Sequence, residues 1–388
     1  MQAQLFKTGQ GTFAEIDAVF EGLGPRFNSD SCASCHAFPA IGGASPVNNP
    51  QVAFANSRNV LPSFIQPKGP IRIARFVRNA DGTPDGGVHA LFTIDGRADT
   101  PSGCTLKQED FSNPSNLSLR IPTPVFGLGL IEAISDRVLV QNLNANVDAK
   151  AALGIHGRFN RNGNDGTITR FGWKAQNKSL EIFAGEAYNV EQGITNMLFP
   201  NERDDTPQCS SAGSPNDLIH LESSGTLGVM TDVTLLAAFM RFLAPPERSA
   251  ITPGVVDGSN LFTGIGCAEC HTPALTTGQN GYGGPLSGQT IHPYSDFAIH
   301  RMGPKLADQV SQGLAGGDEF RTAPLWGVGQ RLFFLHDGRR TDLVMAILDR
   351  ASPGNAQFPA SEANAVIEKF DLLDVNDKQA ILDFLRSL

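Results

Sequence analysis

Two short segments of the chain share one pattern of reactive side chains. Residues 32–36 read CASCH and residues 267–271 read CAECH, so each holds two cysteines separated by two residues and followed directly by histidine. Two thiols at this spacing can form thioethers to the vinyl groups of a porphyrin, and the next imidazole can ligate its iron from one side. The pattern therefore predicts two covalently bound haem c groups.

The residues expected to hold the first haem are Cys32, Cys35 and His36, and those expected to hold the second are Cys267, Cys270 and His271. In each set the histidine is the predicted iron ligand. The alternatives are a zinc site or a redox-active dithiol. Zinc usually needs a second pair of ligands at shorter separation, and a thioredoxin-type dithiol needs a βαβ context that the sequence lacks.

Two further cysteines, Cys104 and Cys209, lie outside these motifs. Haem attachment of this type takes place in an oxidising compartment, where spare thiols tend to pair. A bridge between them would close a loop of about a hundred residues and contribute up to about 4 to 5 kcal/mol. We favour a disulfide over the alternative of two separate buried thiols.

Apolar segments with helical character precede both motifs and are expected to pack against the haems. They span residues 5–20 and 259–266. Other helices are predicted near 125–141, 179–197 and 233–243. The last is followed by the Pro-rich break APPERSAITPG at 244–254, which predicts a domain boundary.

The final helix is predicted from spacing alone. Apolar residues follow the i, i+3, i+4, i+7 pattern at Ile381, Phe384, Leu385 and Leu388, and Asp374 is placed to cap the start. Few segments alternate as strands do. The expected fold is mainly α with long loops. The domains are residues 1–244, a haem domain with large insertions, and residues 245–388, the second haem domain.

Composition narrows the class of protein. The 388 residues carry a net charge of −9 without any run of Lys or Arg, which disfavours a nucleic-acid or anionic-membrane surface. The chain contains 41 glycines and 25 prolines, which is typical of a loop-rich fold. No apolar run of about 18 residues is present to span a bilayer, and the first residues show no export signal.

A likeness to a known family extends over nearly the whole chain, from about residue 5 to 388. It is carried by GLGPRFNSDSCASCHAFPAIGGASP, LFTIDGRAD, RIPTPVFGLGLIEAI, RFGWKAQ, HRMGPKLAD, FRTAPLWGVG and FLHDGR. These stretches resemble the di-haem oxidoreductases of the peroxidase-like or "thiol oxidoreductase" family. More distantly, the chain is similar to bacterial di-haem cytochrome c peroxidases, the di-haem enzyme that matures methylamine dehydrogenase, and rubber oxygenases.

The resemblance implies two cytochrome c-like units that exchange electrons. In the peroxidase relatives the N-terminal haem meets peroxide and the C-terminal haem receives electrons. It also implies a distal glutamate that moves a proton as the O–O bond breaks, and Glu132 in TPVFGLGLIEAI is our candidate. The alternative for Glu132 is a helix-surface carboxylate. His89 is a second candidate for the distal side or else a core histidine, and His156 and His220 are weaker.

The second haem departs from the family pattern at its sixth ligand. Relatives carry His or Met fourteen residues after the histidine of HDG, whereas this chain has Arg350 there, and a guanidinium cannot ligate iron. Met302 or His300 from IHRMGPKLAD could replace the ligand, with Met302 ranked first. Met345 could do so if its helix is shifted, or the iron could be five-coordinate. Met302 and His300 could instead have structural roles.

Several residues are expected to support the haems. His336 is a candidate partner of a propionate, as are Arg339 and Arg340, because a guanidinium matches a carboxylate in a fork. Trp173 is our candidate for electron exchange, with Trp326 as the alternative; either could be core filling.

Residues 160–167, NRNGNDGT, are rich in oxygen-bearing side chains and glycine, as calcium loops are, and the relatives bind calcium. These residues lack the alternating acids and terminal glutamate of an EF-hand, so a plain turn is favoured and calcium is the alternative.

The predicted function is that of a periplasmic di-haem c oxidoreductase, peroxidase-like. One haem would react with hydrogen peroxide or another small oxidant, and the other would transfer electrons from a small redox protein. The alternatives are an electron-transfer or sensing cytochrome without turnover, and an oxygenase resembling the rubber-cleaving relatives.

Overall fold

The computed structural model describes residues 2–54, 61–85, 92–93, 97–202, 206–210, 230–279 and 283–388. Contacts among residues divide the chain into two compact units, each assembled from several segments. The first consists of residues 1–126, 180–243 and 336–338, and the second of 127–179, 244–335 and 339–388.

These units can be compared with the predicted domains. The chain passes from the first unit to the second after residue 243, next to the predicted boundary at 244. Residues 127–179, which the sequence analysis placed in the first domain, make their contacts within the second unit. The assignment of one haem domain to 1–244 and another to 245–388 stays a prediction.

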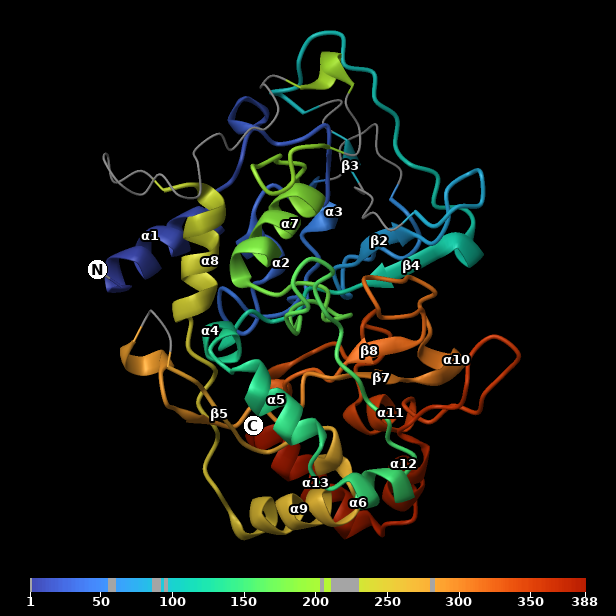
Figure 1. Cartoon of the computed structure of the whole chain (residues 1–388). Coiled ribbons are helices and arrows are strands. Elements are labelled where there is room, and N and C mark those ends of the chain that lie inside the picture. Colours follow the sequence, from blue (N-terminus) through green and yellow to red (C-terminus); the bar gives the residue numbers. More distant parts are fainter. Residues whose placement is uncertain are drawn as a thin grey trace. The chain divides into compact units, whose positions relative to one another are not determined.

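The first unit is built from helices with two small antiparallel ladders (Figure 1). Its helices are α1 (Gln2–Ala14), η1 (Val19–Glu21), α2 (Cys32–Cys35), α3 (Gln51–Phe54), η2 (Pro114–Asn116), α7 (Leu180–Gln192), η3 (Pro207–Cys209) and α8 (Asp232–Phe242). Its strands are β1 (Arg26–Phe27) paired with β3 (Phe92–Thr93), and β2 (Ile73–Phe76) paired with β4 (Leu117–Arg120).

The second unit contains more helices and equally short strands. Its helices are α4 (Leu128–Glu132), α5 (Asp136–Leu143), α6 (Val147–Ala152), α9 (Pro253–Gly264), η4 (Cys267–Glu269), η5 (Gly284–Leu286), α10 (Gly303–Leu306), η6 (Val328–Gln330), α11 (Leu343–Leu348), α12 (Asn364–Asp371) and α13 (Val375–Ser387). Its antiparallel strands are β5 (Leu275–Thr276) with β6 (Thr290–Ile291), and β7 (Ile299–Arg301) with β8 (Glu319–Arg321). The described chain is therefore rich in helix and poor in sheet.

The last helix forms as predicted. Asp374 lies just before α13, and its carboxylate accepts hydrogen bonds from the backbone N–H groups of Asn376 at 2.8 Å and Asp377 at 2.9 Å. The predicted apolar face is buried, at Ile381, Phe384, Leu385 and Leu388. Helical periodicity and a capping residue were sufficient to predict this element.

Other predicted helices are present with different bounds. The segment predicted at 5–20 begins earlier and ends at Ala14, because Ala18 begins a separate turn of 3-10 helix. The segment predicted at 259–266 is the second half of α9, which begins after the side chain of Thr252 caps the N–H of Val255. That start was missed because the Pro-rich stretch indicated a break, whereas proline is favoured in a first helical turn.

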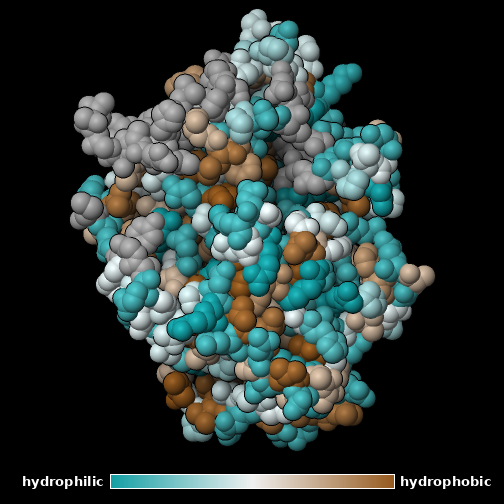
Figure 2. Space-filling view, in the orientation of Figure 1, coloured by the Kyte–Doolittle hydropathy of each residue, from teal (hydrophilic) through white to brown (hydrophobic). Residues whose placement is uncertain are grey.

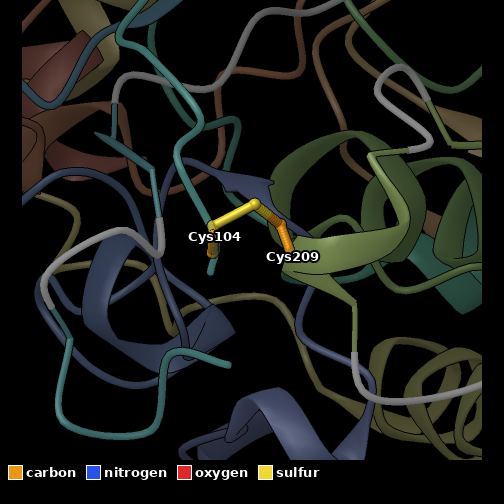
Figure 3. The surroundings of a disulfide bond; sticks show 2 residues. All are labelled: Cys104 and Cys209. Atoms are coloured by element: carbon orange, nitrogen blue, oxygen red, sulfur yellow. A yellow bond between two sulfur atoms is a disulfide. The ribbon is translucent and has the colours of Figure 1, made fainter. Parts of the chain in front are cut away.

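Cys104 and Cys209 form a disulfide, as predicted (Figure 3). Both are buried within a hydrophobic cluster of the first unit. The other members of that cluster are Val19, Leu23, Phe27, Ile65 and Ala74. The bridge joins positions 105 residues apart in the sequence and so restrains a long stretch of the unit.

Removing this bridge should destabilise the protein measurably. A cross-link over a separation of 105 residues limits the freedom of the unfolded chain by about 4 to 5 kcal/mol in the entropic account. The variant Cys104→Ala/Cys209→Ala is therefore expected to unfold at a lower urea concentration than the oxidised protein. A midpoint equal to that of the wild type would show that the bridge adds nothing to stability.

Within the part of the chain that the structure describes, no helix is long and apolar enough to cross a membrane. On the face drawn in Figure 2, hydrophobic residues are interspersed with hydrophilic ones.

Candidate functional site

The first motif forms a short helix that ends at a buried histidine. Cys32–Cys35 are helical in α2, and His36 follows as the C-terminal cap. The Nδ1 atom of His36 lies 3.1 Å from the carbonyl oxygen of Gly43. Burial lowers the pKa of His36 to about 4, so its imidazole is neutral at ordinary pH. A neutral ring whose Nδ1–H donates to a carbonyl offers its Nε2 lone pair to a metal.

The second motif repeats this arrangement with different residues. Cys267–Glu269 form η4, and the Nδ1 atom of His271 lies 2.8 Å from the carbonyl oxygen of Tyr294. Burial is the largest cause that lowers the pKa of His271 to about 4. Both motif histidines are thus neutral and are oriented through the same ring nitrogen. Histidines that bind metals are commonly held in this way, by a backbone carbonyl that accepts from the nitrogen not bound to the metal.

A helix crossing lies behind each motif. In the first unit α1 packs on α8 at Gly9, where an added Cβ would overlap the carbonyl oxygen of Leu235. Phe13, one turn beyond Gly9, packs on Phe239 at 4.7 Å between ring centroids and on His36 at 5.8 Å. Glycine therefore permits a close crossing that sets an aromatic ring against the motif histidine.

The second unit contains the same crossing. Helices α9 and α13 lie side by side (Figure 1), and an added Cβ at Gly258 would overlap the carbonyl oxygen of Ala380. Phe262, again one turn beyond the glycine, lies 5.2 Å from Phe384 and 6.2 Å from His271. The sequence analysis recognised the helix before each motif but not its crossing partner, because the partner lies more than a hundred residues away in each case.

The four motif thiols are not joined in disulfides. Burial raises the pKa of Cys35 and of Cys267 to about 12, so these thiols are protonated at neutral pH. A redox-active dithiol needs a thiolate of depressed pKa, so these raised values disfavour that alternative.

One cluster of potential metal ligands occurs among the described residues, formed by Cys270, Asp296 and His300. His300 is buried, with Nε2 3.0 Å from Asp296 Oδ2 and Nδ1 2.9 Å from Glu362 Oε2. Both ring nitrogens thus face carboxylate oxygens, so neither nitrogen is directed at an open position where it could ligate iron.

Met302 lies in surroundings of a different kind. Its half-buried side chain packs against the hydrophobic cluster of the second unit, as do Cys267 and Cys270. Its backbone N–H donates to the carbonyl of Asp318 at 2.9 Å. Of the two predicted replacements for the sixth ligand, Met302 has the geometry that is more compatible with the role. Met345 is exposed on α11.

Arg350 follows the C-terminal cap of α11 and donates from Nη1 to the carbonyl of Ala346. It lies close enough to the second motif to influence the pKa values of both Cys267 and His271. The residue at the unexpected position therefore contributes a positive charge beside the predicted haem.

Two candidate residues from the sequence analysis, Glu132 and Trp173, belong to the second unit. Glu132 is the half-buried last residue of α4 in the second unit. The buried guanidinium of Arg170 fixes this turn, because Nη1 donates to the carbonyls of Ile131 at 3.4 Å and Ile134 at 2.5 Å. Trp173, also half-buried in the second unit, accepts a backbone hydrogen bond from Arg321.

The predicted propionate partners are distributed over both units. His336 is buried in the first unit, and its carbonyl accepts from Ile121. Arg339 is exposed and donates to the carbonyl of Lys305 at 3.0 Å. Arg340 already holds the Asp349 carboxylate with two donors, at 2.5 and 3.1 Å. Their role as propionate partners stays a prediction.

Residues 160–167 form a turn stabilised by their own hydrogen bonds. The N–H of Asn162 donates to the Thr167 carbonyl, and that of Gly166 donates to Asn162, both at 2.9 Å. The Asp165 carboxylate binds the ammonium of Lys178 at 2.5 Å, which lowers the pKa of Asp165 to about 2. Its carboxylate is thus already paired with a cation.

Among the weaker candidates, His156 is exposed, whereas His89 and His220 lie outside the described residues.

The end of α7 supplies acidic residues that the sequence analysis missed. Glu191 is half-buried, and burial raises its pKa to about 7, with a further contribution from Glu186 and an opposing one from Arg75. It lies near enough to Cys32 and Cys35 to raise the pKa values of both. Nothing in the local sequence of α7 distinguishes Glu191 from a surface residue.

Gln192 connects this end of α7 to a second buried acid. Its Oε1 accepts from Cys32 Sγ at 3.2 Å, and its Nε2 donates to Asp17 Oδ2 at 2.5 Å. Burial raises the pKa of Asp17 to about 7 against the opposing hydrogen bond from Gln192, with further contributions from Glu15, Asp232 and Glu21. Tyr188 lies 3.5 Å from its other oxygen.

Asp17 should make stability depend on pH. Its pKa rises from 3.8 unfolded to about 7 folded, so the folded chain keeps a proton that the unfolded chain loses between these values. Stability contributed by Asp17 therefore falls as pH rises through this window. Asp17→Asn is expected to exceed the wild type in free energy of unfolding by on the order of 2 to 4 kcal/mol at pH 8, and by little below pH 4. Urea unfolding at both pH values measures this; a difference independent of pH would contradict it.

Comparison with known proteins adds a family assignment. Residues 87–388 match the family described as "Di-haem oxidoreductase, putative peroxidase". The matched range contains the second motif and begins after the first. No curated protein matches the chain.

Three solved structures are similar at low identity. Hydrazine synthase from Kuenenia stuttgartiensis is 14% identical with a TM-score of 0.42, over 100% of this chain and 88% of that one. The diheme peroxidase BthA from Burkholderia thailandensis is 15% identical with a TM-score of 0.34, over 99% and 86%. A MauG-like protein associated with microbial copper homeostasis is 17% identical with a TM-score of 0.33, over 68% and 89%.

Proposed function

The chain belongs to the di-haem oxidoreductase family, and on that premise we propose that it is a periplasmic enzyme with two covalently bound haems that reduces hydrogen peroxide or another small oxidant. The observation that carries the proposal is the repeated arrangement of the two motifs. Each sets two thiols that are not in disulfides beside a neutral histidine whose Nδ1 is held by a backbone carbonyl. This donor set fits haem c.

The haems, when bound, supply the iron that accepts electrons and reacts with the oxidant. The residues of the chain have separate tasks. Cys32 and Cys35 would hold one porphyrin by thioether bonds, and Cys267 and Cys270 would hold the other. His36 and His271 would supply the imidazole ligands of the irons, and the carbonyls of Gly43 and Tyr294 keep each imidazole ring in one orientation.

A carboxyl group is needed to carry a proton between the two oxygens of peroxide. Glu132 is the candidate from the family resemblance. Glu191 is the candidate from geometry, because it lies beside the first motif and its pKa of about 7 allows it to hold and release a proton near neutral pH. Trp173 is proposed to assist electron exchange, and a small redox protein to supply the electrons.

The proposed location is supported by chemistry of the cysteines. The disulfide between Cys104 and Cys209 is of the kind that forms in oxidising compartments. Covalent haem attachment also belongs to such a compartment. Calcium is not part of the proposal, because Asp165 in its candidate loop already binds Lys178.

The rival function is an electron-transfer or sensing cytochrome in which both irons have six ligands. The position of Met302 against the same cluster as Cys267 and Cys270 favours this rival, since it could complete the ligand set of the second haem. The oxygenase alternative would need a hydrophobic substrate channel.

Low-temperature EPR of the protein, expressed with haem-maturation machinery, separates these functions. We expect a high-spin ferric signal beside a low-spin one, from one open iron and one ligated iron. Two low-spin signals would favour the rival.

Turnover then tests the reaction itself. The pre-reduced protein should consume peroxide with a reduced small cytochrome as donor, and absence of turnover would contradict the enzyme assignment. Glu132→Gln and Glu191→Gln identify the proton carrier, because its loss should lower the rate by about 10²- to 10⁴-fold while the other variant stays close to the wild type.

A further inference from the structure

Three arginines of the second unit are near enough for their charges to interact, Arg331 with Arg321 and Arg350 with Arg331, and none of the three is in an ion pair among the described residues. Arg321 is the last residue of β8, Arg331 follows η6, and Arg350 follows α11. We call these residues the arginine cluster. By contrast, Arg158 is paired with Glu319 and Arg340 with Asp349 in the same unit.

The hydrogen bonds of the cluster leave donors unused. Arg321 Nε donates to the carbonyl of Gly172 at 2.9 Å, and Arg350 Nη1 donates to the carbonyl of Ala346. Arg331 has two buried nitrogens, Nε and Nη2, that find no hydrogen-bond partner among the described residues. A buried guanidinium with unused donors is costly unless an anion completes it.

The charges of the cluster also repel one another. Burial lowers the pKa of Arg331 to about 10 with a contribution from Arg350, and lowers that of Arg321 to about 10 with a contribution from Arg331. Asp349 is the carboxylate that acts on the pKa of Arg350, and it already binds Lys305 and Arg340. The cluster therefore holds excess positive charge that the described residues do not neutralise.

The cluster lies at the second motif. Arg350 contributes to the pKa values of Cys267 and His271. Arg331 follows Val328, a buried member of the hydrophobic cluster against which Cys267 and Cys270 pack. The hydrophobic cluster and Arg331 together suit a ligand with two parts. Its apolar part would pack on the cluster, and its anionic group would bind the guanidinium of Arg331.

We propose that the arginine cluster, with Arg331 at its centre, binds the two propionate carboxylates of the haem attached at Cys267 and Cys270. A guanidinium fork can hold a carboxylate with two parallel hydrogen bonds, which matches the two free nitrogens of Arg331. This site replaces Arg339 and Arg340 as the predicted partners. The inference rests on the proposed function, because it needs a haem at the second motif.

Potentiometric titration of the holoprotein tests it. Loss of a positive charge beside the haem favours the oxidised iron, so Arg331→Gln should lower the midpoint potential of the second haem. We expect at least a tenfold change in the ratio of oxidised to reduced iron at a fixed potential, about 59 mV for one electron. Arg386→Gln is the matched control, because Arg386 is 54% exposed and its loss removes the same charge from the same unit.

Arg331→Lys keeps the charge and should hold the potential near that of the wild type, and it serves if the glutamine variant does not fold. Equal midpoint potentials of the second haem in the wild type, Arg331→Gln and Arg386→Gln would overturn the inference. A wild-type potential that shifts when phosphate is added would also overturn it, because the cluster would then bind a free anion. Mass spectrometry of the peptide that contains Cys267 is the separate check on the haem. If that peptide carries no haem, the proposed function itself fails.

Discussion

Replacing Cys267 and Cys270 together by alanine is expected to remove one covalently bound haem from the chain and to leave the other in place. Both thiols of the second motif lie on the hydrophobic cluster where the porphyrin is proposed to bind, and the thioethers are its covalent link to the chain. Intact-mass spectrometry of the purified variant should show a protein lighter by one haem. Cys32→Ala/Cys35→Ala should do the same at the first motif.

The chain provides a matched control for this experiment. Cys104→Ala/Cys209→Ala removes the same number of sulfur atoms, but from a disulfide in the first unit. It should retain both haems even though it is less stable. A variant at 267 and 270 that keeps two covalently bound haems would exclude the second motif as an attachment site.

The second large effect is expected at Arg350. Arg350→His should convert the second iron to a six-coordinate, low-spin state with two histidine ligands. Arg350 occupies the position, fourteen residues after His336, at which relatives carry a ligand, and it lies beside Cys267 and His271. Histidine there can offer the nitrogen lone pair that a guanidinium lacks. Low-temperature EPR before and after the substitution measures the change of spin state.

Arg350→Gln separates ligation from charge in this experiment. It removes the same positive charge as the histidine variant but supplies no imidazole, so it should keep the spin state of the wild type. If Met302 already ligates the iron, Arg350→His should instead lower its potential, because axial methionine favours the reduced iron relative to bis-histidine ligation. Identical EPR spectra and potentials for the wild type and Arg350→His would show that residue 350 does not reach the iron.

Sequence reasoning predicted best the features that depend on residue type or on spacing along the chain. The cysteine pair at 104 and 209 followed from the compartment that haem attachment requires, and the helix ending at residue 387 followed from apolar spacing and a capping aspartate. The family followed from motifs spread along the chain. Each of these depends on the type of a residue or on its distance along the sequence.

Features formed by distant residues could not be predicted in this way. Glu191 resembles any acid at the end of a helix until the fold places it near the first motif. Arg331 lacks a partner only because β8, η6 and α11 come together in the second unit. The preference for Met302 over His300 likewise depends on Asp296 and Glu362, which enclose the histidine ring from separate parts of the chain.

The two helix crossings amount to one local design that occurs twice in the chain. Gly9 with Phe13 and Gly258 with Phe262 share the same spacing, and each phenylalanine lies against a motif histidine. A substitution made at a position in one crossing therefore has an equivalent in the other, so each unit can serve as the internal reference for the other.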